Sequence, residues 1–349
     1  MRQLILNRKS IIPGMLLAFT LAFISQFIHN NIVIGSQKPI SGVIIAILLG
    51  MLINNTIGVG KIFRPGINFA MKKVLQAAIF LLGLGLSFMA VITTGSSALI
   101  IILICVSFAI TITYLFGKKL GLPDKLATLI GIGTAICGST AIVAASPAID
   151  AKDEEITFSV ATITIFGVVA IFVYPLIGKM LLLTDMQFGT WAGVAVHETA
   201  QVIAAGFAFS DPAGQIATVV KLTRTVLLAP IVLILGVIYA NKQKNAAGDT
   251  GKKISYIKIF PWFVVGFLAM AGLRTVGDSM WLNNEMWVNF LDNTKVFSKF
   301  LIVTAMAGVG LLTNFDDMKK VGIKPFIVGL VASLIMAVFS ITLIFTLNI

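Results

Sequence analysis

Charged residues are scarce in this sequence. Only 11% of its 349 residues are Asp, Glu, Lys or Arg, whereas 58% are hydrophobic and the mean hydropathy is +1.01. A soluble protein of this length has no means of burying so much apolar surface. The composition therefore excludes a soluble fold and predicts an integral membrane protein.

Cysteine is equally rare. Cys105 and Cys137 are the two cysteines and both lie in apolar segments, which argues against a disulfide framework or a metal cluster. Basic residues give a net charge of +12, but they are scattered in short inter-helix segments without an aromatic and basic platform, so nucleic acid is not an expected partner. We expect no cofactor and no bound metal.

The apolar runs predict an all-α, polytopic membrane protein. Runs long enough to cross a hydrocarbon core of roughly 30 Å lie near residues 11–30, 40–56, 70–94, 96–117, 156–183, 213–240, 257–277, 298–315 and 322–348. Two more segments, 124–150 and 188–210, are hydrophobic but interrupted midway by Gly, Ser, Pro and polar residues. We therefore predict about nine full spans plus two broken or re-entrant helix hairpins, with 1–349 as a single membrane transporter domain.

The chain also repeats itself. At an offset of 60 residues, the stretch Cys137–Ala145 lies over His197–Ala205, and a weaker match joins Gly83–Phe88 to Gly308–Phe315. The shared Ser/Thr-Ala start and Ala-Ala end favour duplication over mere likeness of composition, and such repeats are common in transporters. We place repeat A at about 40–183 and repeat B at about 188–349.

The number of crossings decides how the repeats are oriented. An odd number of crossings separates the helix at 72–95 from its counterpart at 299–318, so this pair is inverted. The two broken segments are inverted as well only if each enters and leaves on one side. The positive-inside rule then places the N-terminus in the cytoplasm and the C-terminus outside, because the outside keeps only Lys38, Lys179, Arg274, Lys295 and Lys299.

Two cations interrupt an apolar span. Lys221 and Arg224 are three residues apart and share one helix face, roughly 12 Å and 16 Å deep at 1.5 Å rise per residue. Ionisable groups at this depth usually mark a functional site. One interpretation pairs them with Glu198 and locks the helix; the other, slightly favoured, has them hold an anionic substrate.

Hydroxyl residues begin the second half of each broken segment. Ser139 and Thr140 do so in the first and Thr199 in the second. These are N-cap residue types, and a helix N-terminus attracts anions. Cys137 and Gly138 precede the first of these helix starts and join the candidate set.

His197 and Glu198 open the second break. His-Glu-Thr-Ala-Gln stops one residue short of a zinc-protease signature, because Gln201 stands where the second His belongs, so a metalloprotease is not predicted. Glu198 is either a carrier of a coupling proton or a fixed counter-ion, the second being somewhat favoured. Gln201 is a hydrogen-bonding candidate. The predicted substrate-binding set is Cys137, Gly138, Ser139, Thr140, His197, Glu198, Thr199, Gln201, Lys221 and Arg224.

The motifs Gly131–Ala145, His197-Glu-Thr-Ala-Gln-Val and Lys221-Leu-Thr-Arg224 resemble those of the YeiH-like family of sulfate exporters, over nearly the whole chain. The resemblance implies a bacterial inner-membrane transporter, distantly similar to the cation–proton antiporter and bile-acid symporter group. It also implies an elevator-type cycle, in which a core moves against a scaffold. Family members often carry an acidic residue after the His, and Glu198 fits that pattern.

Two functions are therefore weighed. The first is a secondary transporter of a small anion, such as sulfate or sulfite, with a lipid bilayer and a second copy of the chain as further partners. The alternative is a cation–proton antiporter that uses Glu198 as its ion site, with Lys221 and Arg224 structural. An enzyme is not predicted, because no catalytic pair has a convincing spacing.

Overall fold

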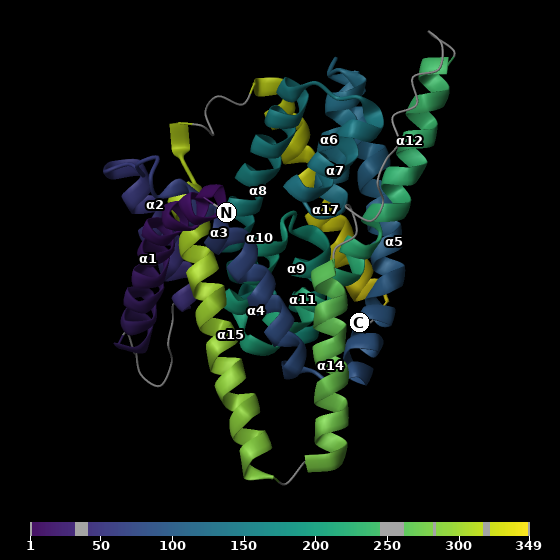
Figure 1. The fold of residues 1–349 in the computed structure, drawn as a ribbon. Coiled ribbons are helices and arrows are strands. Elements are labelled where there is room, and N and C mark those ends of the chain that lie inside the picture. The colour runs from purple at the N-terminus through teal and green to yellow at the C-terminus, as the bar shows by residue number, and fades with distance from the viewer. Residues whose placement is uncertain (1, 32–40, 245–261, 282–283, 317–321, 348–349) are drawn as a thin grey trace. The chain divides into compact units, whose positions relative to one another are not determined.

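The computed structural model describes residues 2–31, 41–244, 262–281, 284–316 and 322–347, and every element in this part of the chain is helical (Figure 1). Eight of these helices are long and apolar enough to cross a membrane. The predicted fold class, an all-α polytopic membrane protein, is confirmed. By packing, the chain divides into two compact units: the first holds 1–93, 203–215 and 262–315, and the second holds 94–202, 216–261 and 316–349.

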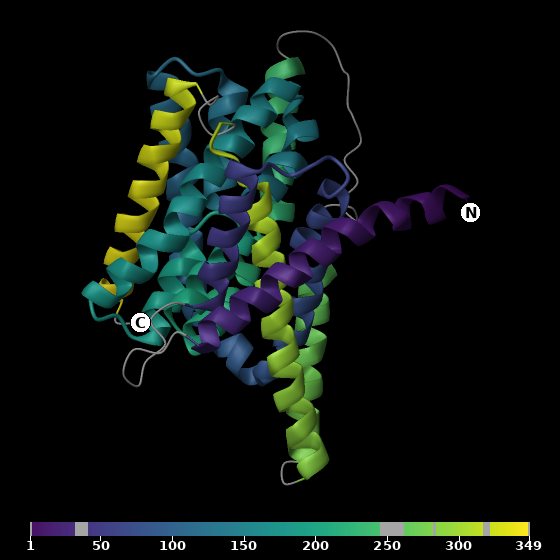
Figure 2. The same cartoon turned by 90° about the vertical axis from the view of Figure 1, so that its left-hand side faces the viewer.

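The first unit is built around one long helix, α15 (Glu285–Leu312). Against it pack α1 (Arg2–Asn31), α2 (Gly42–Thr56), α3 (Arg64–Phe69) and α4 (Leu75–Leu82). The remaining elements of this unit are the π-helical turn η1 (Ala70–Val74), the 3-10 turn η2 (Gly83–Gly85) and α14 (Trp262–Trp281). Figure 2 shows α1 crossing α15 obliquely.

Small residues lie where helices of the first unit come close together. A Cβ built on Gly50 of α2 would lie 2.7 Å from the Ala307 carbonyl oxygen of α15, too near for any side chain. Small residues let membrane helices approach closely in this way. The first unit is therefore a tight bundle whose helix axes have little freedom to separate.

The second unit contains both broken segments. Its helices are most of α5 (Phe88–Lys119), α6 (Asp124–Ala135), α7 (Ser139–Ile149), α8 (Asp153–Met180), α9 (Asp185–Ala195), α12 (Leu228–Lys244) and α17 (Ile323–Thr346). Two helices have the unit boundary inside them, α10 (Thr199–Phe209) and α11 (Asp211–Val226), and contribute 199–202 and 216–226. Each unit thus draws helices from both predicted repeats.

The first broken segment is a helical hairpin. Helix α6 ends at Ala135 and α7 begins at Ser139, and the Lys125 ammonium at the outer end of α6 donates to the Asp150 carbonyl just past α7. The two outer ends therefore lie together, as the repeat analysis predicts for 124–150. The second segment is also broken as predicted, with α9 ending at Ala195 and α10 beginning at Thr199.

Two predicted boundaries are wrong. The helix predicted over 70–94 stops at η2 and α5 starts at Phe88, because Gly83, Gly85 and Ser87 interrupt the helix well before residue 95. The predicted span at 40–56 is a helix of 15 residues, shorter than a full crossing requires. The predicted span 213–240 corresponds to the apolar span Asp211–Tyr239, in which Leu227 forms a single turn between α11 and α12.

Candidate functional site

All ten predicted site residues lie in the second unit and gather around the two breaks. The site is therefore described without reference to the first unit. It is built from the C-terminal ends of α6 and α9, the N-terminal ends of α7 and α10, and the C-terminal half of α11. Contacts with two neighbouring helices place the site near the middle of both. Gln201 donates to the Thr164 carbonyl near the middle of α8, and His197 forms a hydrogen bond with Ser333 near the middle of α17.

Lys221 is fully buried and its ammonium faces the backbone of both breaks. It donates to the carbonyls of Ile136 at 2.9 Å and Val196 at 3.1 Å, and also to that of His197. An ammonium has three N–H donors, so these carbonyls use all of them. In the free ends of α6 and α9 such carbonyls carry the negative end of the helix dipole, and Lys221 neutralises them.

Arg224 does the same one turn further along α11. Its side chain is fully buried. Among the described residues, its hydrogen-bond acceptors are all backbone carbonyls. The acceptors are Ala135 at 2.6 Å, Thr134 at 2.5 Å, Gly193 at 3.2 Å, Val196 at 3.2 Å, and Val194. The planar guanidinium is suited to this, because it presents five donors in a fixed fork. Arg224 therefore joins the end of α6 to the end of α9.

The predicted lock with Glu198 is not formed. Within the described residues, neither Lys221 nor Arg224 comes within ion-pair distance of the Glu198 carboxylate. Glu198 instead accepts a hydrogen bond from the Ser139 backbone N–H at 3.2 Å. Its carboxylate thus lies at the N-terminus of α7, the positive end of that helix dipole. The acidic side chain of one broken segment serves the helix start of the other.

Gly138 makes this contact possible. Its φ of 71° and ψ of −134° lie in a region that only glycine adopts without strain. A Cβ at this position would also overlap the Glu198 side chain. Gly138 is the N-cap of α7, so Ser139 is the first helical residue and not the side-chain cap that its residue type predicts.

Gln201 fixes the start of α10. Its Oε1 accepts from the Glu198 backbone N–H at 3.4 Å, and its Nε2 donates to the Thr164 carbonyl of α8 at 3.2 Å. A Cβ on Gly167 would fall on the Gln201 amide, so Gly167 leaves the space that Gln201 occupies. Sequence reasoning missed Thr164, Gly167 and Ser333, although a glycine inside the long apolar helix α8 was a signal of close approach.

Exposure separates the candidates into two groups. Lys221, Arg224, His197, Gln201 and Cys137 are buried. Ser139, Glu198 and Thr199 are half-buried and Thr140 is exposed. The second group forms the accessible part of the site, at the two helix starts. In the described residues, no three or more His, Cys, Asp or Glu side chains are grouped to hold a metal ion.

Comparison with known proteins identifies the family of this chain. Residues 13–329 match the model of a family described as conserved hypothetical protein 698. The chain belongs to this family. It is 38% identical over 336 residues to a UPF0324 membrane protein of Clostridium tetani, covering 94% of both chains. It is 36% identical over 341 residues to UPF0324 membrane protein SAG1125 of Streptococcus agalactiae, covering 96% of this chain and 97% of that one.

A more distant relative belongs to the same group. The UPF0324 membrane protein of Nitratidesulfovibrio vulgaris is 31% identical over 325 residues, covering 91% of this chain and 88% of its own. The family assignment made from the motifs is confirmed. The relatives are described as membrane proteins, and the chain is a multi-pass membrane protein.

Proposed function

We propose that the protein is a secondary transporter of a small anion, such as sulfate or sulfite, across the bacterial inner membrane. The observation that carries this proposal is an imbalance of charge at the two breaks. Two buried cations, Lys221 and Arg224, face the two negative helix ends of α6 and α9. Facing the two positive helix ends there is one carboxylate, Glu198, which accepts from the first N–H of α7 and directly precedes α10 in the chain.

This imbalance favours an anion. A helix end carries about half an elementary charge, so the two cations together exceed the two negative ends that they face, whereas the single carboxylate of Glu198 only offsets the two positive ends. The site therefore keeps an excess of positive charge in a region of low dielectric. A small anion at the half-buried starts of α7 and α10, beside the hydroxyls of Ser139, Thr140 and Thr199, would neutralise it.

Proton coupling through Glu198 follows from the same geometry. The carboxylate already occupies the Ser139 N–H that an incoming anion would use. Two negative groups compete for one helix N-terminus, so anion binding is favoured when Glu198 takes up a proton. Elevator-type alternating access, a cytoplasmic N-terminus, an outside C-terminus and a homodimer remain parts of the proposal that are carried by the sequence alone.

One observation favours the second candidate, a cation–proton antiporter. Lys221 and Arg224 donate to backbone carbonyls, which is the structural role that this alternative assigns to them. Glu198 would then be the shared ion site. The excess positive charge weighs against it, because a cation would add to the imbalance.

The test is a screen of purified protein by thermal shift. Sulfate, sulfite and chloride are compared at constant sodium, and sodium and potassium at constant anion, across pH. A ligand that binds the folded state raises the midpoint with its concentration. We expect a shift with an anion that grows as pH falls, and matching anion flux in proteoliposomes. Shifts and flux that follow sodium or potassium and ignore the anion would replace the proposal by the antiporter.

A further inference from the structure

The first unit holds two turns of the chain in the same way. The turn Leu84–Phe88 lies between η2 and α5, and the turn Thr313–Phe315 follows α15. Both come just before the chain passes into the second unit, at 93/94 and at 315/316. They are also the ends of the two matching repeat segments, Gly83–Phe88 and Gly308–Phe315.

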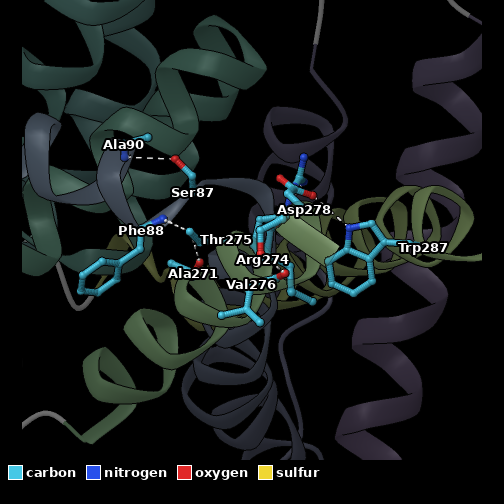
Figure 3. Close-up of polar contacts among 11 residues, drawn as sticks. Ser87, Phe88, Ala90, Ala271, Arg274, Thr275, Val276, Asp278 and Trp287 are labelled. Carbon is cyan, nitrogen blue, oxygen red and sulfur yellow. Dashed lines mark hydrogen bonds and ion pairs between the residues drawn. The ribbon is translucent and has the colours of Figure 1, made fainter. Parts of the chain in front are cut away.

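The first turn is held by α14, and this contact is called the first clamp. The Phe88 N–H donates to the Thr275 hydroxyl at 2.8 Å, and Arg274 Nη1 donates to the Leu84 carbonyl at 3.1 Å. Thr275 in turn donates to the Ala271 carbonyl of its own helix at 3.0 Å, which orients its oxygen toward Phe88 (Figure 3).

Arg274 is itself held in place. Its Nε donates to Asp278 at 2.6 Å, and the other carboxylate oxygen of Asp278 accepts from the Trp287 indole at 2.9 Å (Figure 3). Trp287 lies in the first turn of α15, so the first clamp is anchored to the long helix of the first unit. A side chain fixed from both sides loses little entropy when it binds the Leu84 carbonyl.

The second turn is held by α2, and this contact is called the second clamp. The Phe315 N–H donates to Asn55 Oδ1 at 2.8 Å. Asn55 Nδ2 and Asn54 Nδ2 donate to the Thr313 carbonyl at 2.9 Å and 3.1 Å. Asn54 is buried, in a protein where a buried polar group without a partner is costly.

The two clamps exchange partners between the repeats. Helix α14 of repeat B holds the turn of repeat A, and α2 of repeat A holds the turn of repeat B. In each, a side-chain oxygen accepts from the N–H of a phenylalanine, and a side-chain nitrogen donates to a carbonyl earlier in the turn, four residues before Phe88 and two residues before Phe315. Different residue types, Arg-Thr and Asn-Asn, thus make a similar pair of contacts.

We propose that Phe88 and Phe315 are the two fixed pivots of the transport movement. The hydrogen bonds to Thr275 and Asn55 persist through the cycle, while α5 and α17 leave the pivots and carry the second unit. The inference rests on the proposed function, because it requires that the site moves during transport. It does not depend on the charge of the substrate. The substrate-site contacts lie wholly in the second unit, so loosening a pivot changes the rate and leaves binding intact.

The test uses Thr275→Val and Asn55→Leu, which remove the acceptors and keep the side-chain size. The matched controls are Thr294→Val and Asn68→Leu, whose polar groups bond only within their own helices. We expect flux in proteoliposomes to fall about tenfold in each clamp variant, the factor that corresponds to one hydrogen bond of about 1.4 kcal/mol. The anion-dependent thermal shift stays that of the wild type, and Thr275→Ser restores the flux.

A second readout separates failure of the pivots from failure of the anion proposal. Thr140→Cys places a thiol at the exposed start of α7, and an impermeant thiol reagent is added to either side of the membrane, with the wild type and its buried Cys105 and Cys137 as the control. Two-sided labelling of Thr140→Cys, together with no anion-dependent thermal shift or flux in the wild-type protein, overturns the proposed anionic substrate and leaves the proposed movement standing. If Thr275→Val and Asn55→Leu show the same flux and the same two-sided labelling as their control variants, the proposal that Phe88 and Phe315 are pivots is wrong.

If neither clamp variant folds, the wild type decides. Hydrogen exchange of the Phe88 and Phe315 amides is measured by mass spectrometry, with and without saturating substrate. Persistent pivots keep both amides protected to the same extent in the two conditions. An increase of tenfold or more in their exchange when substrate is present means that the clamps open during the cycle, and overturns the proposal.

Discussion

The Glu198 carboxylate accepts the Ser139 backbone N–H at 3.2 Å, across the gap between the two broken segments. An acidic side chain of the second segment therefore occupies the place of an anion on the first. In the proposed mechanism, an anionic substrate that reaches the start of α7 competes with the Glu198 carboxylate for this N–H. The charges at the site are therefore separated: Glu198 lies at a helix N-terminus, whereas the two cations lie at helix C-termini.

Arg224→Ala is expected to prevent folding, because it leaves the carbonyls of Ala135, Thr134, Gly193 and Val194 without their donor, whereas that of Val196 keeps Lys221. Each buried group left unsatisfied costs about 1–3 kcal/mol, against a total stability of about 5–15 kcal/mol. We expect the thermal midpoint in detergent to fall by more than about 10 °C, or no monodisperse protein. Thr223→Ala, on the same helix, is the control. A folded Arg224→Ala protein that has lost only anion binding would instead make Arg224 a direct substrate ligand.

Gly138→Ala is expected to lower the thermal midpoint by several degrees. The new side chain would be strained at φ 71° and would displace Glu198, at a cost of about 1–3 kcal/mol. The control is Gly272→Ala in α14, where a Cβ meets nothing within 4 Å and helix propensity predicts a gain of up to about 1 kcal/mol. Equal midpoints for the two variants would show that Gly138 is not required by the backbone.

Glu198→Gln is expected to strengthen anion binding. The carboxylate competes with an incoming anion for the Ser139 N–H, and the neutral amide removes that negative charge while keeping the size of the side chain. The measurement is the anion-dependent thermal shift of variant and wild type at one pH. Glu154→Gln, exposed at the start of α8, is the control; equal shifts in Glu198→Gln and the wild type would mean that Glu198 does not compete with the anion.

Gly167→Ala and Gln201→Ala are expected to be strongly non-additive. The single Gly167→Ala change drives the Gln201 amide from the Thr164 carbonyl, whereas in the Gln201→Ala background the added methyl group enters vacated space. We expect a coupling of at least about 1 kcal/mol in a double-mutant cycle from thermal or denaturant unfolding. Additive effects would mean that α8 and α10 do not compete for this space.

The sequence was sufficient for the class of fold and for the position of both breaks, because long apolar runs and their interruptions are local signals. It was insufficient to predict the interruption of the helix at residues 83–88. Hydropathy remains high through Leu84 and Leu86, and only the structure shows that Arg274 and Thr275 stabilise an interrupted helix there. Contacts between residues so distant in the chain leave no periodicity to read.

The structure brings together the ten residues proposed from the sequence, but the hydrogen-bond partners of the two cations were not predicted. The positions of Lys221 and Arg224 indicated buried charges that need partners, and the sequence offered Glu198 or a substrate as those partners. Both interpretations considered side chains and ligands alone. The actual acceptors are backbone carbonyls, which every residue carries, so residue identity gave no means of choosing Thr134 or Val194.

The cations that complete the breaks also come late in the chain. Thr134–Ile136 and Gly193–His197 precede Lys221 and Arg224 in the sequence, so neither break carries these donors within its own segment. Lipid offers the free carbonyls no donor. The two broken segments therefore depend on a third segment, α11, to complete their hydrogen bonds, and a fragment that ends before residue 221 lacks both donors.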